Sequence, residues 1–244
     1  MAASVCEVRN LTVHYGKRVA VDNLELDLQA GDVTLLLGPN GAGKSTALSA
    51  ISGALVPTSG SVSIGGCDLA VDPLGAKAKL GFADQPPALY EFLTVAEHLE
   101  FVAAARNAAP KEVERVMSQL QLSGIAGRPC RELSYGMRQR VGLAAALVGE
   151  VALVLLDETL NGLDPYAARS ARAAVEDVAA RGAAVLMSTH LLGGAERMCQ
   201  RAIIMDAGRV VADKRGAALA ELVAGGAGAL EELYVSVVAD RGPT

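Results

Sequence analysis

The sequence lacks the cysteine spacing of a metal or redox motif. It contains four cysteines, and none of them belongs to a Cys-x-x-Cys pair, the spacing typical of zinc sites and of thiol–disulfide exchange. We interpret them as small core or surface residues of a protein in a reducing compartment.

An excess of basic residues is also missing. The formal net charge is −5 and the isoelectric point is about 5.3. A protein with this balance has no general attraction for a polyanion such as nucleic acid. We therefore predict no nucleic-acid partner.

Long apolar segments are absent as well. The first ten residues, "MAASVCEVRN", have no apolar stretch of the kind that secretory signals carry. The longest apolar run, residues 141–156, is interrupted by Glu150 and is shorter than the roughly 20 residues needed to span a bilayer. It is typical of a buried helix that leads into a buried strand, and we expect a cytoplasmic protein.

What the sequence does contain is an alternation of short apolar runs and helical patterns. This order predicts an α/β fold with a mainly parallel sheet and crossover helices. Residues 5–16 and 18–32 instead alternate apolar and polar side chains, which predicts antiparallel strands in a small separate sheet. Residues 93–122 are dominated by helix formers and predict a helical insertion.

The stretch "GPNGAGKST", residues 38–46, lies between an apolar strand pattern and a helical pattern. Glycines let successive backbone N–H groups point at phosphate oxygens, with the positive end of the next helix behind them. Lys44 adds a positive charge near the β and γ phosphates, and the Ser45 hydroxyl is expected on Mg²⁺. The predicted nucleotide ligands in this stretch are Gly38, Asn40, Gly41, Gly43, Lys44, Ser45 and Thr46. A plain glycine-rich turn is the alternative, and the loop alone does not separate a kinase, a GTPase and a motor ATPase.

The stretch "LVLLDE" ends a buried strand pattern with two acids. A carboxylate at Asp157 is costly there unless it binds a metal ion or a hydrogen-bond partner, so we predict that it reaches Mg²⁺ through water. Glu158 is predicted to accept a hydrogen bond from the water that attacks the γ-phosphate. Two adjacent acids favour hydrolysis over transfer to an acceptor. The alternative is a pair that caps the next turn.

Taken in order, the motifs resemble those of the ATP-binding subunit of an ABC transporter, from about Val5 to Val238. The resemblance rests on the phosphate loop (Walker A), Gln85 (Q-loop), "LSYGMRQR" (signature), "LVLLDE" (Walker B), "LNGLDP" (D-loop) and His190 in "MSTH" (switch histidine). It implies a P-loop NTPase fold with a RecA-like core, an N-terminal antiparallel β-subdomain and an inserted α-helical subdomain. "ISGALVPTSGSVSIGG" and "LEELYVSVV" further resemble bacterial exporters that pair a separate ATPase with a separate permease.

The resemblance also implies the organisation of the chain. Residues 1–244 form a single ABC ATPase domain. Residues 1–84 and 135–216 make the catalytic core with its β-subdomain, and residues 85–134 make the helical subdomain with the signature at its end. Residues 217–244 are a C-terminal tail.

Individual roles follow from the same resemblance. Tyr15 is expected to stack on adenine, the alternative being an exposed tyrosine of an edge strand. Gln85 is expected to sense Mg²⁺ and the attacking water, and His190 to contact the γ-phosphate and hold that water. His14 and His98 match no motif, and we interpret them as surface or satisfied histidines.

The signature departs from the family's usual Leu-Ser-Gly-Gly-Gln. Ser134 and Gly136 remain and are expected to contact the γ-phosphate of an ATP held by the opposite subunit. Tyr135 and Met137 replace the first glycine and the glutamine, and we expect the phosphate contact to survive these changes. Thr159, where the family usually has proline, loosens a turn without removing a ligand.

The function implied is an ATPase that uses ATP and Mg²⁺ to drive a membrane permease by alternating access. One sequence contains both the loop-side residues Lys44, Glu158 and His190 and the signature residues Ser134 and Gly136. This favours a homodimer around two ATP molecules. The resemblance implies that it is peripheral on the inner face of the cell membrane. A soluble ABC ATPase, such as an iron–sulfur assembly scaffold, shares every motif and is the main alternative. A small-molecule P-loop kinase would lack the signature and switch histidine. A nucleic-acid-associated ABC protein would usually have two cassettes or a long coiled-coil insertion.

Overall fold

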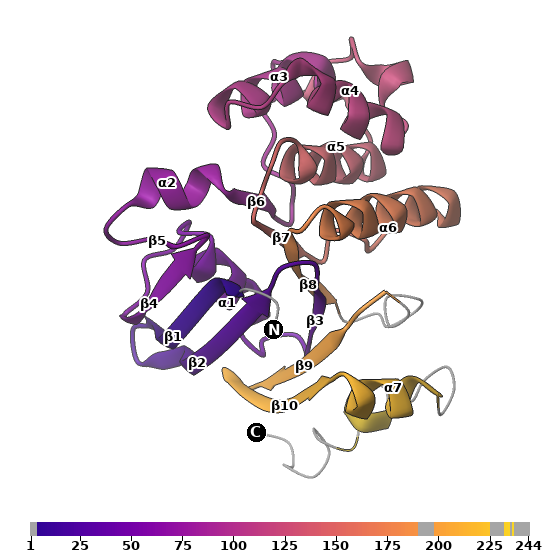
Figure 1. Ribbon diagram of the computed structural model, residues 1–244. Coiled ribbons are helices and arrows are strands. Elements are labelled where there is room, and N and C mark those ends of the chain that lie inside the picture. The colour runs from indigo at the N-terminus through magenta and orange to yellow at the C-terminus, as the bar shows by residue number, and fades with distance from the viewer. Residues whose placement is uncertain (1–3, 190–197, 225–231, 235, 237–244) are drawn as a thin grey trace.

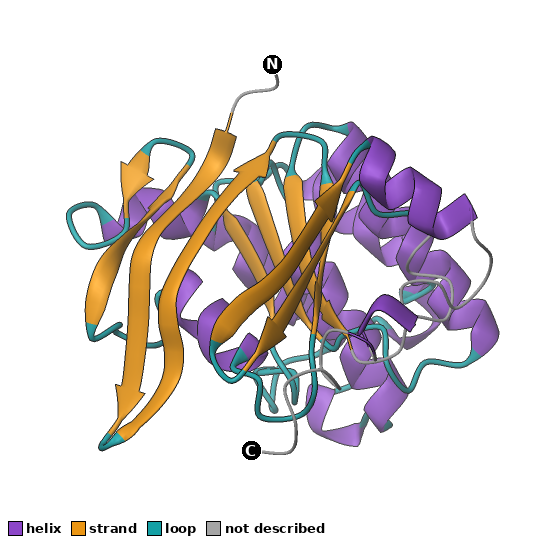
Figure 2. Ribbon diagram, turned by 90° about the horizontal axis from the view of Figure 1, so that it is seen from below, coloured by secondary structure: helices purple, strands orange, loops and turns teal. Residues whose placement is uncertain are grey.

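The computed structural model describes residues 4–189, 198–224, 232–234 and 236 (Figure 1). Within them, the chain folds into two sheets with helices packed around them (Figure 2). The strands are β1 (Ser4–Tyr15), β2 (Arg18–Gln29), β3 (Val33–Leu37), β4 (Ser59–Ile64), β5 (Cys67–Asp68), β6 (Leu80–Ala83), β7 (Leu153–Asp157), β8 (Ala184–Thr189), β9 (Arg201–Asp206) and β10 (Arg209–Arg215). The helices are α1 (Lys44–Ile51), α2 (Pro73–Ala78), α3 (Val95–Ala105), α4 (Pro110–Gln119), α5 (Tyr135–Leu147), α6 (Pro165–Ala180) and α7 (Ala217–Ala224).

The larger sheet has the strand order β10-β9-β3-β8-β7-β6, and only β10 runs antiparallel to its neighbour. Every residue of β3, β7 and β8 is buried. Strands covered on both faces need apolar side chains on both faces, which explains the continuous apolar runs in the sequence. The predicted mainly parallel α/β core is confirmed.

Alternate side chains of these strands belong to two separate hydrophobic cores. Leu35 and Leu37 join the core under helices α3 to α6, whereas Leu36 joins the core shared with α1 and the smaller sheet. The same alternation in β7 sends Val154 to the first core and Leu155 to the second. Packing on both faces holds the carboxyl ends of the parallel strands in place, and the candidate site residues lie at those ends.

The smaller sheet has the order β2-β1-β4-β5, and all its pairs are antiparallel. Its first two strands coincide with the predicted antiparallel segments. The tight turn between them pairs Tyr15 with Arg18. Figure 1 shows this sheet beside the larger one, next to α1.

The predicted helical insertion forms α3 and α4. Thr94 and Glu97 cap the start of α3 reciprocally, and Pro110 occupies the first position of α4, where its missing N–H has no intrahelical partner to lose. The next helix, α5, packs against both α3 and β6. It therefore joins the insertion to the core, and the limits predicted for the helical subdomain stay a prediction.

Hydrogen bonds of charged side chains connect the helical insertion to the core. Glu112 of α4 accepts hydrogen bonds from Arg115 and from Arg181, which follows α6, each at 3.0 Å. Burial opposes the ionisation of Glu112, but the two guanidinium groups outweigh it and lower its pKa. Arg106 donates to the carbonyl oxygens of Ala145 and Val148 at the end of α5.

The interpretation of His98 as a surface or satisfied histidine is wrong. Its side chain is 2% exposed, and Nε2 has no hydrogen-bond partner among the described residues. Burial lowers its pKa from the ordinary value of 6.5. His14 is exposed. Cys6 and Cys130 are buried, whereas Cys67 and Cys199 are partly buried, in line with small core or surface residues.

None of the helices in the described part of the chain combines the length and the apolar character that crossing a membrane requires.

Candidate nucleotide-binding site

The glycine loop connects β3 to α1, the order that the sequence predicted. Gly43 lies directly before α1 with φ of 100°, a conformation that side chains disfavour. A Cβ at this position would lie 2.3 Å from the carbonyl oxygen of Ala20. Only glycine fits. No side chain caps the start of α1, and the residues of its first turn, Lys44 to Thr46, line the space above the loop.

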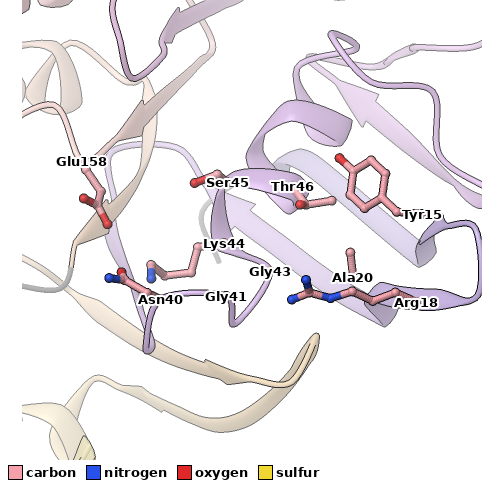
Figure 3. Close-up of a pocket in the computed structure, with 10 residues that line it drawn as sticks. All are labelled: Tyr15, Arg18, Ala20, Asn40, Gly41, Gly43, Lys44, Ser45, Thr46 and Glu158. Carbon is pink, nitrogen blue, oxygen red and sulfur yellow. The ribbon is translucent and has the colours of Figure 1, made fainter.

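A pocket of about 210 Å³ lies over this loop. Figure 3 shows Glu158 at one end of the pocket and Tyr15 and Arg18 at the other. The lining residues are Tyr15, Arg18, Ala20, Asn40, Gly41, Gly43, Lys44, Ser45, Thr46 and Glu158. Most of the predicted nucleotide ligands are thus brought together, although Gly38 is not among the lining residues.

Lys44 is the buried cation of the pocket. Its side chain belongs to a residue that is only 5% exposed, and Nζ donates to the carbonyl oxygens of Gly38 at 2.8 Å and Pro39 at 3.1 Å. Burial lowers the pKa of the ammonium group, while the charges of Glu158 and Asp157 offset part of that shift. A phosphate anion supplies the charge partner that such a cation favours.

The two acids at the end of β7, Asp157 and Glu158, are both hydrogen-bonded to one hydroxyl. Ser188 of β8 donates to Asp157 Oδ1 at 2.5 Å and accepts the backbone N–H of Glu158 at 2.9 Å. Glu158 has φ of 47°, an uncommon conformation for a residue with a side chain. Asn161 Nδ2 donates to Glu158 Oε2 at 3.3 Å. The hydrogen bonds around this turn support its strained conformation, and the Glu158 side chain lines the pocket.

Gln85 does not line the pocket. Its Nε2 donates to the hydroxyl of Tyr135 at 2.9 Å. The structure therefore places the predicted sensing glutamine against the start of α5 and not among the residues that line the pocket.

The signature residues are also outside the pocket. Ser134 caps α5, where its Oγ accepts the N–H of Met137 at 3.4 Å. A Cβ at Gly136 would have no atom within 4 Å. Ser134 is exposed, and this start of a helix faces outward. His190 lies outside the described residues.

Arg18 and Ser188 are among the residues of the site that were missed in the sequence. Arg18 could have been found from the Gly-Lys turn that places it opposite Tyr15. Ser188 stands two residues before the predicted switch histidine, but its partners are about 30 residues away, 31 for Asp157 and 30 for Glu158, and no local pattern announces them.

The oxygen atoms of the site suit Mg²⁺. Ser45 offers a hydroxyl and Asp157 a carboxylate, and Mg²⁺ prefers oxygen ligands, usually one or two from protein together with substrate phosphates and water. Among the described residues there is no cluster of three or more His, Cys, Asp or Glu side chains that would form an all-protein metal site. The residues thus fit a magnesium ion that arrives with a nucleotide.

The sequence matches the family model described as ABC transporter over residues 21–161, which include both the glycine loop and the acidic pair. The chain belongs to this family. It is an ATP-binding subunit and an ATPase of the ABC type, with a P-loop NTPase fold.

Similar proteins of known name agree with this assignment. The ABC-type transporter ATP-binding protein EcsA of Bacillus subtilis is 34% identical over 238 residues, which cover 96% of each chain. The Nod factor export ATP-binding protein I of Rhizobium leguminosarum is 34% identical over 219 residues, 88% of this chain and 70% of that protein.

Solved structures agree as well. The ATP-binding subunit of an ABC transporter superposes with a TM-score of 0.87 at 32% identity, covering 96% of this chain and all, 100%, of the other. The dimeric structure of the bacterial ABC transporter cassette MJ0796 gives a TM-score of 0.79 at 26% identity, covering 86% of this chain and 98% of the other.

Proposed function

We propose that two copies of this ABC ATPase enclose two ATP molecules head to tail. Each ATP would be held by the phosphate loop of one copy and by Ser134 and Gly136 of the other. The observation that carries the proposal is the separation of these parts: the signature lies on an exposed helix start and does not line its own chain's pocket. The similarity to a cassette with a dimeric structure supports it.

Within each site, the residues of the phosphate loop would bind the nucleotide. Lys44 neutralises charge on the β and γ phosphates, and Tyr15, which is 53% exposed, offers its ring to adenine. Mg²⁺, when bound with ATP, neutralises phosphate charge; Ser45, Asp157 and Gln85 are the residues that would hold it. Ser188 keeps the Asp157 carboxylate in place.

Hydrolysis requires a positioned water. Glu158 lies at the end of the pocket opposite Tyr15 (Figure 3), where its carboxylate would accept a hydrogen bond from water in line with the γ-phosphate. His190 would orient the same water. Closing a second copy over the pocket excludes bulk water and adds the Ser134 hydroxyl and helix N–H groups to the γ-phosphate.

We further propose that the motor drives a separate membrane permease, in the direction of export, through a surface formed by residues that follow Gln85 in the chain. This surface, which we call the aromatic patch, consists of Tyr90, Phe92 and Phe101, exposed by 54%, 82% and 50%. Tyr90 and Phe101 pack edge to face at 4.9 Å. Exposed aromatic side chains of this kind anchor protein interfaces. The Nod factor export relative supports the direction.

The experiment compares membrane attachment of variants in the native cells. Phe92→Glu should move most of the chain from the membrane fraction to the supernatant while the purified chain keeps its ATPase activity. The matched control is Val56→Glu, since Val56 is 87% exposed and lies between α1 and β4. A wild-type chain that never sediments with membranes would refute the permease proposal and favour a soluble ABC ATPase. Equal loss in both variants would show that the aromatic patch has no special role.

A further inference from the structure

One hydroxyl joins the predicted sensing glutamine to the signature helix. The Tyr135 oxygen accepts hydrogen bonds from Gln85 Nε2 at 2.9 Å and from Gln139 Nε2 at 2.7 Å. Gln85 lies in the loop after β6, while Tyr135 and Gln139 lie one turn apart on α5. We call these two hydrogen bonds the Tyr135 link.

The Gln139 side of the Tyr135 link is buried in the protein. Gln139 is completely buried, and its Oε1 has no partner among the described residues, so the phenol oxygen is the partner that its amide has. A buried amide that lost this bond would be left without a partner, at a cost. The Tyr135 side chain is therefore held in one orientation although the residue is 48% exposed.

The ring of Tyr135 also packs against the loop between β7 and α6. Gly162 in this loop has φ of +76°, and a Cβ there would lie 3.3 Å from a carbon of the Tyr135 ring. The tyrosine thus contacts the loop after β6, the start of α5 and the loop that follows the acidic pair. A glycine at position 135 would offer none of these contacts.

We propose that the Tyr135 hydroxyl is a positioning group that holds the Gln85 amide at the start of α5 through Nε2, so that the side chain must leave this hydrogen bond to bring its Oε1 to Mg²⁺ when the metal binds with ATP. The proposal rests on the proposed function, because that function makes Gln85 a ligand of the metal. Two observations carry it: Gln85 does not line the pocket, and its amide is already bonded to Tyr135. The exchange would connect occupancy of the pocket to the helix that bears Ser134.

The first test uses the full-length chain without nucleotide. In ¹⁵N spectra, Tyr135→Phe should shift the side-chain amide signals of both Gln85 and Gln139 and speed the exchange of their protons. The signals are assigned with Gln85→Leu and Gln139→Met. Tyr166→Phe is the matched control, because Tyr166 is a 70% exposed tyrosine at the start of α6. Unchanged amide signals in Tyr135→Phe would overturn the link itself.

The second test measures how much the metal strengthens nucleotide binding. The quantity is the ratio of two dissociation constants of a non-hydrolysable ATP analogue, one in EDTA and one in excess Mg²⁺, from calorimetry. A net hydrogen bond changes an equilibrium constant by about 2- to 10-fold. Tyr135→Phe should therefore raise the ratio by about that factor and leave the value in EDTA unchanged, while Tyr166→Phe changes neither.

A double-mutant comparison separates positioning from a general structural role. On the Gln85→Leu background, Tyr135→Phe should no longer change the ratio, because the competing partner has gone. A ratio that is unchanged or lower in Tyr135→Phe alone, or one that rises equally without Gln85, would overturn the proposal. A wild-type chain whose ratio is 1 would instead contradict the proposed role of the metal site, and the amide spectra would still test the link.

Discussion

In the proposed dimer the phosphate loop and the signature are the two halves of one site, and this chain builds them differently. The loop half is a lined pocket of about 210 Å³, with a cation that is 5% exposed and backbone that admits only glycine at Gly43. The signature half is an exposed helix start, where Gly136 has open space around it. The pocket of the first half can surround a phosphate chain, whereas in the proposed dimer the second half meets a nucleotide that another copy carries.

The two halves also differ in charge. The loop half brings the cations Lys44 and Arg18 to a pocket that Glu158 also lines. The signature half offers a neutral hydroxyl, backbone N–H groups and the positive end of a helix dipole. Fully charged side chains contribute most to the affinity for ATP, while aligned neutral donors mainly orient its γ-phosphate. We therefore expect the loop half to control binding and the signature half to control closure.

Breaking the loop half should have the largest effect. Lys44→Ala removes the buried ammonium group that faces the phosphates, and the loss of a buried charge partner corresponds to a fall in ATP affinity of roughly 100-fold or more. Calorimetric titration checks it, with the exposed Lys111→Ala as the control. ATP affinity within a few-fold of the wild type would contradict a dominant role for this half.

Breaking the signature half should abolish closure and spare binding. Ser134→Arg places a bulky cation at a positive helix start, against the second copy. We expect ATPase activity to be lost while one copy still binds ATP within about twofold of wild-type affinity. Fluorescence measures ATP binding and phosphate release measures ATPase activity, both on the same sample, so the two effects can be compared directly. A variant that loses both together would show that the two halves are not separable.

A smaller effect on catalysis is expected from the loss of the Ser188 hydroxyl, which bonds to Asp157 and to the backbone of Glu158. Ser188→Ala removes the hydrogen bonds to Asp157 and to the Glu158 backbone, and we expect kcat to fall about tenfold, a loss of about 1.4 kcal/mol. Ser170→Ala is the control, because Ser170 has a comparable hydrogen bond with Gln121 on the surface. An unchanged kcat would mean that the turn positions Glu158 without Ser188.

The smallest expected effect is on how protein stability depends on pH, through His98 of the helical insertion. Burial lowers the pKa of His98, in the helical insertion, below 6.5. The unfolded chain then binds more protons than the folded one between those two pKa values, so stability falls as the pH drops through 6.5. Between pH 7.5 and 5.5 the free energy of unfolding should fall more in the wild type than in His98→Leu. Parallel pH curves in urea titrations would contradict this.

The sequence predicted those parts of the molecule that depend on neighbours along the chain. The pocket residues from Asn40 to Thr46 are contiguous, and glycine geometry and strand–loop–helix order determine how they lie. The fully buried β3 and β7 were visible as unbroken apolar runs, because both faces of these strands are covered.

The parts that sequence reasoning missed depend on distant pairs. Tyr135 and Gln85 are 50 residues apart, and neither neighbourhood indicates that the phenol and the amide meet. His98 could not be recognised as buried with an unpaired nitrogen, because its burial depends on how the insertion packs. Such contacts follow from the assembled fold and not from local pattern.

The central claim is that a complete site forms only between two copies, and Glu158→Gln tests it most directly. This change keeps the size of the side chain and removes the charge that positions water, so bound ATP should persist and hold the copies together. Light scattering should report the mass of one chain without nucleotide and of two chains with ATP, and adding Ser134→Arg should restore the mass of one. A Glu158→Gln protein that keeps the mass of one chain at saturating ATP would contradict the claim.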